Sequence, residues 1–192
     1  MHKLRVLANE ILEVYRESPD SFQSFQQKTG LTCLPDCGEC CLSNQVSASI
    51  LEMIPAALYL YDHHLADQII TTLEDFDDTN HCIFYIKLST DGKKGRCSRY
   101  DLRPCICRSF GAAAIRGKTG KKILSVCKEI KKFTSLNLDH LDLSGAPVIG
   151  EFSSKILLKE CSALTQVKPI NQALYEALLK VLTVASYNQP TL

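Results

Sequence analysis

Four cysteines lie within nine residues of this chain and constrain its structure more than any other feature. They form the pattern Cys33-x3-Cys37-x2-Cys40-Cys41. The adjacent Cys40 and Cys41 are poor disulfide partners for one another, because a disulfide needs a particular separation of Cα and Cβ atoms. Thiolates this close repel one another, and their pKa values rise unless a cation lies among them. A bound metal supplies that cation, so the pattern predicts a metal site.

The compartment decides whether clustered cysteines bind metal or form disulfides. The chain begins MHKLRVLANEILEVYRE, in which Glu10 and Glu13 interrupt the apolar residues, so we expect no secretory signal. No run of about 18 apolar residues occurs, so we expect no membrane-spanning helix and no membrane partner. The sequence therefore predicts a cytoplasmic protein whose cysteines are reduced.

The length and composition predict one globular domain. The chain has 192 residues, of which 45% are hydrophobic and 22% charged, which is typical of a folded domain. Residues 1–30 are expected to be helical, with one helix to about Glu17, a break at Ser18-Pro19-Asp20, and a short helix ending near Gly30. Residues 31–132 form a cysteine-rich core, and residues 133–192 are expected to be mostly helical.

Local patterns within these regions predict both helices and strands. Ser49 and Glu52 match a capping box and begin a helix that Pro55 is expected to kink. A second helix is expected around residues 65–76, a strand over 81–88, and another helix over 172–186. Residues 111–116 and 122–126 are separated by a Gly-Lys-Thr-Gly-Lys turn and predict a hairpin. The predicted fold class is α+β, predominantly helical, with a small irregular cysteine-rich metal-binding centre and a short hairpin.

A second cysteine-rich segment, residues 96–110, has the sequence RCSRYDLRPCICRSF. Together with the first segment it resembles the YkgJ-type cysteine-cluster family, which is described as a zinc- or iron-chelating domain. Members carry a C-x2-3-C-x2-C-C run, a lone cysteine, the motif C-x-x-Y-x-x-R-P-x-x-C-R-x-F, and a last cysteine about twenty residues on. The resemblance covers about residues 31–130 and leaves both terminal regions unassigned.

The resemblance implies a set of eight metal-ligating cysteines: Cys33, Cys37, Cys40, Cys41, Cys82, Cys97, Cys107 and Cys127. Tyr100, Arg103 and Arg108 belong to the same motif and are candidates for orienting and tuning those ligands. The alternative is that the Arg103-Pro104 turn simply shapes the loop.

Several residues near the motif are interpreted as structural. Cys105 and Cys161 fall outside the family pattern and are interpreted as free, half-buried thiols. His81 is also interpreted as a structural residue, although it adjoins Cys82. His63 and His64, which are neighbours in the sequence, are interpreted as surface residues.

The cofactor is either an iron–sulfur cluster or zinc. Eight thiolates would suit two zinc ions with four ligands each, whereas a 4Fe–4S cluster uses four cysteines. Spacing slightly favours iron–sulfur, because Cys37-x2-Cys40 is the one clean zinc knuckle and Cys105-x-Cys107 is too tight for a second.

The small net charge of +1 hides a segregation of charge along the sequence. Residues 87–132 hold 14 Lys and Arg residues against Asp91, Asp101 and Glu129, which leaves +11 there and −10 elsewhere. The basic residues can neutralise the acidic regions and the thiolate sites. Alternatively, segment 87–132 binds an acidic protein or another anionic partner. No aromatic residues interleave the basic ones as base stacking would require, which argues against nucleic acid.

Two segments approach catalytic motifs without matching them. Gly111 and Gly117 precede Lys118-Thr119, but five residues separate the glycines where a phosphate-binding loop has four. The spacing of Cys33, Cys37 and Cys40 also occurs in radical S-adenosylmethionine enzymes, but this chain lacks the repeated strand–helix alternation of their barrels. No acid–base pair or catalytic triad is recognisable, so whether the protein is an enzyme stays open.

Three functions follow from these patterns. The first is a metal-binding protein with an accessory or redox role. The second is S-adenosylmethionine-dependent lysine methylation of proteins, which the similarity of the cysteine cluster to that of flagellin lysine N-methylases implies. The third is an interaction module stapled by zinc, with the basic segment as its surface.

Overall fold

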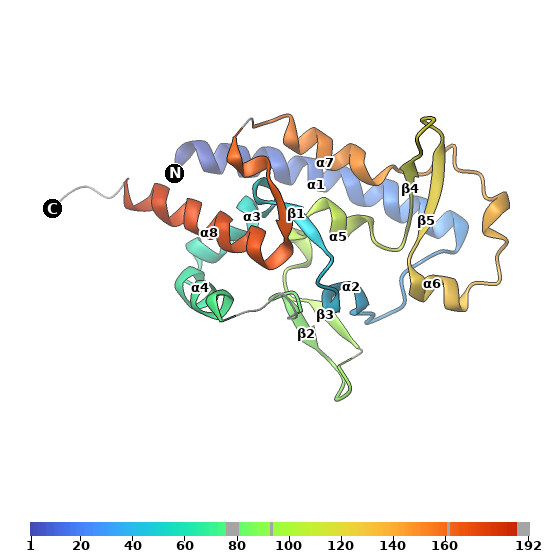
Figure 1. Cartoon of the computed structure of the whole chain (residues 1–192), viewed down its shortest axis with the longest axis horizontal. Coiled ribbons are helices and arrows are strands. Elements are labelled where there is room, and N and C mark those ends of the chain that lie inside the picture. Colours follow the sequence, from blue (N-terminus) through green and yellow to red (C-terminus); the bar gives the residue numbers. More distant parts are fainter. Residues whose placement is uncertain (76–80, 93, 161, 188–192) are drawn as a thin grey trace.

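Helices make up most of this computed structural model, and the longest of them, α1, runs along the long axis of the molecule (Figure 1). The structure describes residues 1–75, 81–92, 94–160 and 162–187, without the side chains of residues 18–20. The α-helices are α1 (His2–Thr29), α2 (Glu39–Leu42), α3 (Ile50–Asp62), α4 (Ala66–Glu74), α5 (Cys105–Ser109), α6 (Lys128–Phe133), α7 (Ile149–Leu157) and α8 (Ile170–Ser186). Short 3-10 helices η1 (Tyr100–Leu102), η2 (Leu138–His140) and η3 (Ala163–Thr165) connect them.

The expected break in the N-terminal region is wrong, because α1 continues without interruption from His2 to Thr29. Ile11 and Tyr15 are buried before residues 18–20, and Phe22 and Phe25 are buried after them. One apolar face therefore packs on both sides of the predicted break, and its burial outweighs the local preference for a turn. The helix ends at Gly30, whose φ of 71° is the left-handed conformation that favours glycine.

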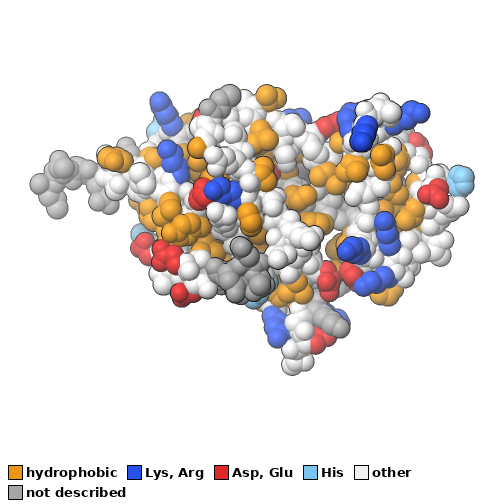
Figure 2. Space-filling model, viewed as in Figure 1, with side chains coloured by type: hydrophobic (Ala, Val, Ile, Leu, Met, Phe, Trp, Pro, Cys, Tyr) orange, Lys and Arg blue, Asp and Glu red, His pale blue; other side chains and the backbone are white. Residues whose placement is uncertain are grey.

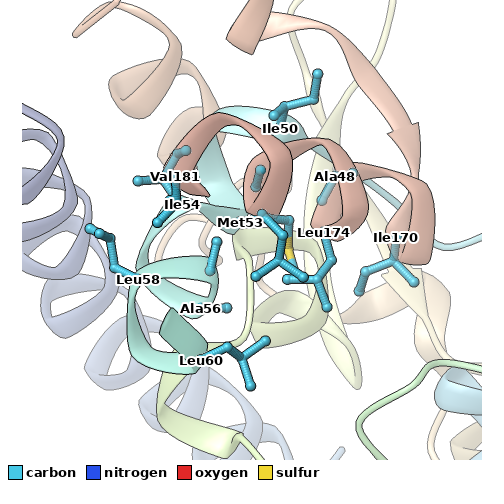
Figure 3. Packing of buried hydrophobic residues seen from close by; sticks show 14 of the residues in the cluster. Ala48, Ile50, Met53, Ile54, Ala56, Leu58, Leu60, Ile170, Leu174 and Val181 are labelled. Atoms are coloured by element: carbon cyan, nitrogen blue, oxygen red, sulfur yellow. The ribbon is translucent and has the colours of Figure 1, made fainter. Parts of the chain in front are cut away.

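Helix α3 forms the centre of the main core and packs against α8. It begins with the predicted capping box, in which the Ser49 side chain accepts from the Glu52 amide and the Glu52 side chain accepts from the Ser49 amide. The helix then continues through Pro55 to Asp62. Figure 3 shows Met53 of α3 lying beside Leu174 of α8, and both are almost completely buried. Burying such a side chain contributes about 1.5–3 kcal/mol.

The strands form three two-stranded antiparallel ribbons among the described residues. They are β1 (Ser47–Ser49) with β6 (Val167–Pro169), β2 (Tyr85–Lys87) with β3 (Gly95–Cys97), and β4 (Ala112–Arg116) with β5 (Lys122–Val126). The predicted hairpin is confirmed by β4–β5, whereas the strand predicted over residues 81–88 shortens to β2. The class is α+β and predominantly helical, as predicted. Within the described ranges no helix is both long enough and apolar enough to cross a membrane.

The β2–β3 ribbon is held to the first cysteine segment by Tyr85. Its ring lies over Gly38 and Gly95, so closely that a Cβ atom on either glycine would overlap the ring. The Tyr85 hydroxyl donates to the Gly92 carbonyl at 2.6 Å, which fixes the ring in that position. The Gly95 amide also donates to the Asp36 carbonyl at 2.9 Å. Glycine at both positions therefore allows the ribbon and the cysteine loop to approach one another.

We expect Gly95→Ala to lower the free energy of unfolding by about 1–3 kcal/mol, because the new methyl group must displace the Tyr85 ring. Thermal unfolding followed by circular dichroism measures this as a lower melting temperature. The matched control is Gly150→Ala in α7, where a Cβ meets no atom within 4 Å. That control should leave stability unchanged or raise it slightly, since alanine is the better helix former. Equal melting temperatures for Gly95→Ala and the wild type would contradict the packing described here.

Candidate metal centre

Seven of the eight predicted ligands line one cavity of about 870 Å³. They come from the loop after α1, from α2, from the segment just before β2, from β3, and from α5. The lining cysteines are Cys33, Cys37, Cys40, Cys41, Cys82, Cys97 and Cys107, and the lining also includes Tyr100, Arg103 and Arg108. Cys127 does not line the cavity; it precedes α6 as its N-cap residue. The floor includes Met53 and Ile170, so the cavity adjoins the α3–α8 core.

The first cysteine segment reaches the cavity through a tight turn and a short helix. The Cys37 amide donates to the Leu34 carbonyl at 3.2 Å, and Asp36 within this turn has a φ of 54°. Aspartate is one of the few residues other than glycine that tolerates this conformation. Helix α2 then carries Cys40 and Cys41. The Cys82 amide donates to the Cys41 carbonyl at 2.8 Å, which joins the lone cysteine to this helix.

The second cysteine segment places its two closely spaced cysteines in different surroundings. Residues two apart on a helix face different directions. Cys105, only 2% exposed, packs with Ile11, Leu51 and Ile156 in a small apolar cluster. Cys107 lines the cavity. Cys105 forms no disulfide in the structure, and it is fully buried rather than half-buried as predicted. Cys161 lies outside the described residues.

The two motif arginines have different surroundings. The charge of Arg103 acts on three cavity thiols, opposing the rise in the pKa of Cys40, Cys97 and Cys107. The Arg103 guanidinium lies 3.4 Å from the centre of the Tyr100 ring. The Arg108 Nε donates to the Arg103 carbonyl at 2.7 Å. Arg103 is therefore a cation near three of the thiols, and Arg99 also acts on Cys97, whereas Arg108 braces the loop that carries Arg103.

Arg99 was not singled out by sequence reasoning, although it lies beside a predicted ligand. Its backbone amide donates to the Cys97 Sγ at 3.4 Å. Its guanidinium lies over the Tyr59 ring at 4.8 Å, and its buried Nε has no hydrogen-bond partner among the described residues. The position is variable in the motif C-x-x-Y, so the motif itself gave no signal for it.

The histidines near the cysteine segments stay outside the cavity lining. His81 is exposed, and its ring contacts Tyr85 edge-on with the ring centres 5.5 Å apart. His63 and His64 are exposed on the far end of α3. The cavity therefore offers sulfur ligands from cysteine rather than a mixed cysteine–histidine set.

Burial and mutual repulsion disfavour the thiolate form of the cavity cysteines. Partial desolvation at the cavity wall and then the neighbouring thiols, Cys37 foremost, raise the pKa of Cys33 to about 11 although its side chain is exposed. Burial raises the pKa of Cys82 to about 12. Burial followed by the charges of Cys82 and Cys40 raises the pKa of Cys107 well above its usual value. A hydrogen bond with Cys41, followed by burial, raises the pKa of Cys40. At neutral pH these raised pKa values favour the protonated thiols, and a further positive charge in the cavity would favour the thiolates.

The thiols share a cavity without converging on one point. In the part of the chain that the structure describes, no three Cys, His, Asp or Glu side chains are arranged to hold one metal ion together. The donor set nevertheless suits zinc and iron–sulfur chemistry, because soft thiolate ligands select those metals. Binding one metal ion through several of these thiols would therefore require them to move closer together.

The comparison with known proteins agrees with the cysteine pattern. The family model CxxCxxCC, titled "Putative zinc- or iron-chelating domain", matches residues 32–134, which is more than half of the chain. No curated protein and no solved structure matches the chain. The match spans both cysteine segments and extends to Cys127 and α6. With seven cysteines gathered around one cavity, the chain belongs to the CxxCxxCC family of zinc- or iron-chelating domains.

Proposed function

We propose that the protein holds a thiolate-bound metal centre with an accessory or redox role, and that Cys40, Cys82, Cys97 and Cys107 are the principal ligands. The observation that carries the proposal is the mutual influence of these four thiols within one cavity. The charges of Cys82, Cys40 and Cys97 all act on Cys107. Cys97 and Cys107 also pack against the same core as the buried Cys82. Four thiolates are the number that one zinc ion or one 4Fe–4S cluster takes.

We call the remaining predicted ligands the rim group: Cys33 is exposed, whereas Cys37, Cys41 and Cys127 are partly buried, as Cys40, Cys97 and Cys107 are. Cys33 is exposed, and the charges that act on it are those of Cys37, Cys40 and Cys127. Cys41 lies next to Cys40 and is its hydrogen-bond partner. The rim cysteines are therefore candidates for a second site or for replacing a principal ligand, and metal content per chain distinguishes these roles.

An iron–sulfur cluster is the cofactor that we favour for the inner four thiols. These four thiols come from four separate points along the chain, whereas common structural zinc sites take their ligands from two knuckles of paired cysteines. The Arg103 cation and the Arg99 amide at Cys97 suit a unit with net negative charge, since hydrogen bonds and nearby cations tune such centres. When bound, the cluster would supply one-electron chemistry. Zinc is the alternative, and it would supply structural stability.

Protein purified without oxygen is expected to contain about four iron atoms and four acid-labile sulfides per chain, with a broad visible absorption band. Cys97→Ser and Cys107→Ser should each remove most of the metal, because each deletes an inner ligand. The matched control is Cys105→Ser, the same change at a thiol of the same helix that does not line the cavity, with a hydroxyl that can still hydrogen-bond with Glu52. Full metal content in both Cys97→Ser and Cys107→Ser would exclude these ligands, and a colourless zinc protein would replace iron–sulfur with zinc.

The rim group has a separate expected outcome. Cys33→Ser should leave the inner centre intact, and thus the iron content and the visible spectrum unchanged. Measurement of metal by mass spectrometry on the same samples checks this. A loss of half of the metal would assign Cys33 to a second site, and a complete loss would show that the inner four do not suffice.

A second candidate function is S-adenosylmethionine-dependent methylation of protein lysines. The cavity volume of about 870 Å³ favours it, because a metal centre fills only part of that space and small-molecule sites are typically about 300–1,000 Å³. We expect calorimetry with the metal-loaded protein to detect binding of S-adenosylmethionine if this function holds. An absence of heat at millimolar ligand would remove it.

A further inference from the structure

Helix α5 carries Cys107 into the cavity, yet it has few means of holding its own position. It spans only Cys105–Ser109, and Pro104 at its N-cap position provides no side-chain hydrogen bond. A helix of one turn is not stable by itself, because nucleation is unfavourable. The amide of Cys105 is moreover one of the first-turn groups that lack a partner within the helix. Contacts from elsewhere must therefore fix α5.

Glu52 of α3 provides that contact. Its side chain is only 4% exposed, and one of its oxygens, Oε1, accepts from the Cys105 amide at 3.1 Å and from the Ser153 hydroxyl at 3.4 Å. The other oxygen, Oε2, accepts from the Ser49 amide at 3.1 Å and from the Ser49 hydroxyl at 2.9 Å. One buried carboxylate thus joins the first turn of α3 to the first turn of α5 and to α7. In addition, the Tyr15 hydroxyl of α1 donates to the backbone carbonyl of Glu52 at 2.6 Å, so that a fourth helix contacts this residue.

We infer that Glu52 is a positioning residue for the metal centre, which fixes α5 so that Cys107 lies with the other inner thiols. The part that concerns metal rests on the function proposed above, whereas the part that concerns α5 does not. A negative charge at the start of α5 is also favourable, because the amide groups there carry partial positive charge. Glu52 lines no part of the cavity and touches no ligand, so its effect passes through α5.

The chemistry of the donors around Glu52 explains why a carboxylate is needed. A capping box accepts glutamine as readily as glutamate at this position, so the cap of α3 alone does not require a charge. Glutamine, however, has one acceptor oxygen and an NH2 group that donates. The backbone amides of Ser49 and Cys105 also only donate, and they lie at opposite oxygens of Glu52. In Glu52→Gln one of these amides must face the NH2 group, and a buried donor without an acceptor is costly.

The experiment measures α5 directly in the metal-free protein. Hydrogen exchange of peptides that cover residues 105–109 should be about tenfold faster in Glu52→Gln than in the wild type, since hydrogen bonds to charged groups are among the stronger ones. The rate of alkylation of Cys107 by iodoacetamide should rise in parallel. The matched control is Ser49→Ala, which removes one hydroxyl donor to Oε2 and leaves Oε1, the acceptor of the Cys105 amide, in place. It should lower the melting temperature and change α5 exchange much less than Glu52→Gln does.

The outcomes separate positioning from general stability. Equal changes in α5 for Glu52→Gln and Ser49→Ala, or none in either, would overturn the inference. If Glu52→Gln does not fold, amide hydrogen exchange of the nitrogen-15-labelled wild type, measured by NMR, tests the inference instead. The Cys105 amide should then be protected from exchange, although it belongs to the first residue of α5 and has no partner within the helix. Fast exchange at that amide would contradict its hydrogen bond to Glu52.

A second arm uses the loaded protein. Transfer of its metal to a chelator should be about tenfold faster in Glu52→Gln than in Ser49→Ala, and equal rates in the two variants would overturn the link to the centre. A wild type that binds no metal would refute the proposed function, while the exchange measurement would still test the role of Glu52.

Discussion

A buried carboxylate holds the helical frame and the cysteine-rich loops together. Burying such a group is unfavourable unless its oxygens are fully hydrogen-bonded. Glu52 meets this requirement with donors from the N-cap residue of α3, from α5 and from α7. The surrounding cluster is apolar, with Ile11, Leu51 and Ile156 fully buried. Such surroundings strengthen each hydrogen bond and make each missing one costly. The geometry at this point therefore determines where α5 lies relative to the core.

The rest of the cavity wall depends on contacts between short elements. A two-stranded ribbon is marginally stable alone, and β2–β3 is only three residues long in each strand. It is held by Tyr85 over its two glycines and by the hydrogen bond of Gly95 to Asp36. Cys82 and Phe84, just before β2, are buried members of the main core. A bound metal would add to the cohesion that this packing supplies, as it does in small metal-binding domains.

The charged residues of segment 87–132 serve different purposes in the structure. Arg103 and Arg108 belong to the cavity and its supporting loop. Other Lys and Arg side chains lie on the surface over the tip of the β4–β5 hairpin and over α6 (Figure 2). Some of these pair locally, as Arg116 does with Glu151 and Lys132 with Glu129. The interpretation of the basic segment as neutralising nearby acidic groups thus accounts for part of it, and its role toward an anionic partner stays a prediction.

Local signals in the sequence predicted the elements that depend on local chemistry. The capping box at Ser49 and the turn between β4 and β5 are of this kind, and both are confirmed. The continuity of α1 was missed because it depends on burial of Phe22 and Phe25 against other segments. The pairing of β1 with β6 joins residues more than a hundred positions apart and involves only three residues in each strand, so no periodic pattern marks it.

Residues around the candidate site show the same limit of sequence reasoning. The motif named the cysteines, and the structure brings seven of them to one cavity. The motif could not show that Cys105 and Cys107 face different surroundings, since both cysteines lie in the same short segment. Glu52 was recognised only as half of a capping box. Its bond to the Cys105 amide crosses 53 positions of the chain, and no local pattern encodes such a contact.

The position of Ile170 in the cavity floor has a consequence for how the protein is made. Ribosomes synthesise the cysteines at positions 33–41 about 130 residues before Ile170 and the rest of α8. Helix α8 completes both the packing around α3 and the floor of the cavity. The earliest thiols therefore leave the ribosome long before the enclosure that would shield them exists. The complete cavity lining therefore exists only after α8 has been synthesised and has packed against α3.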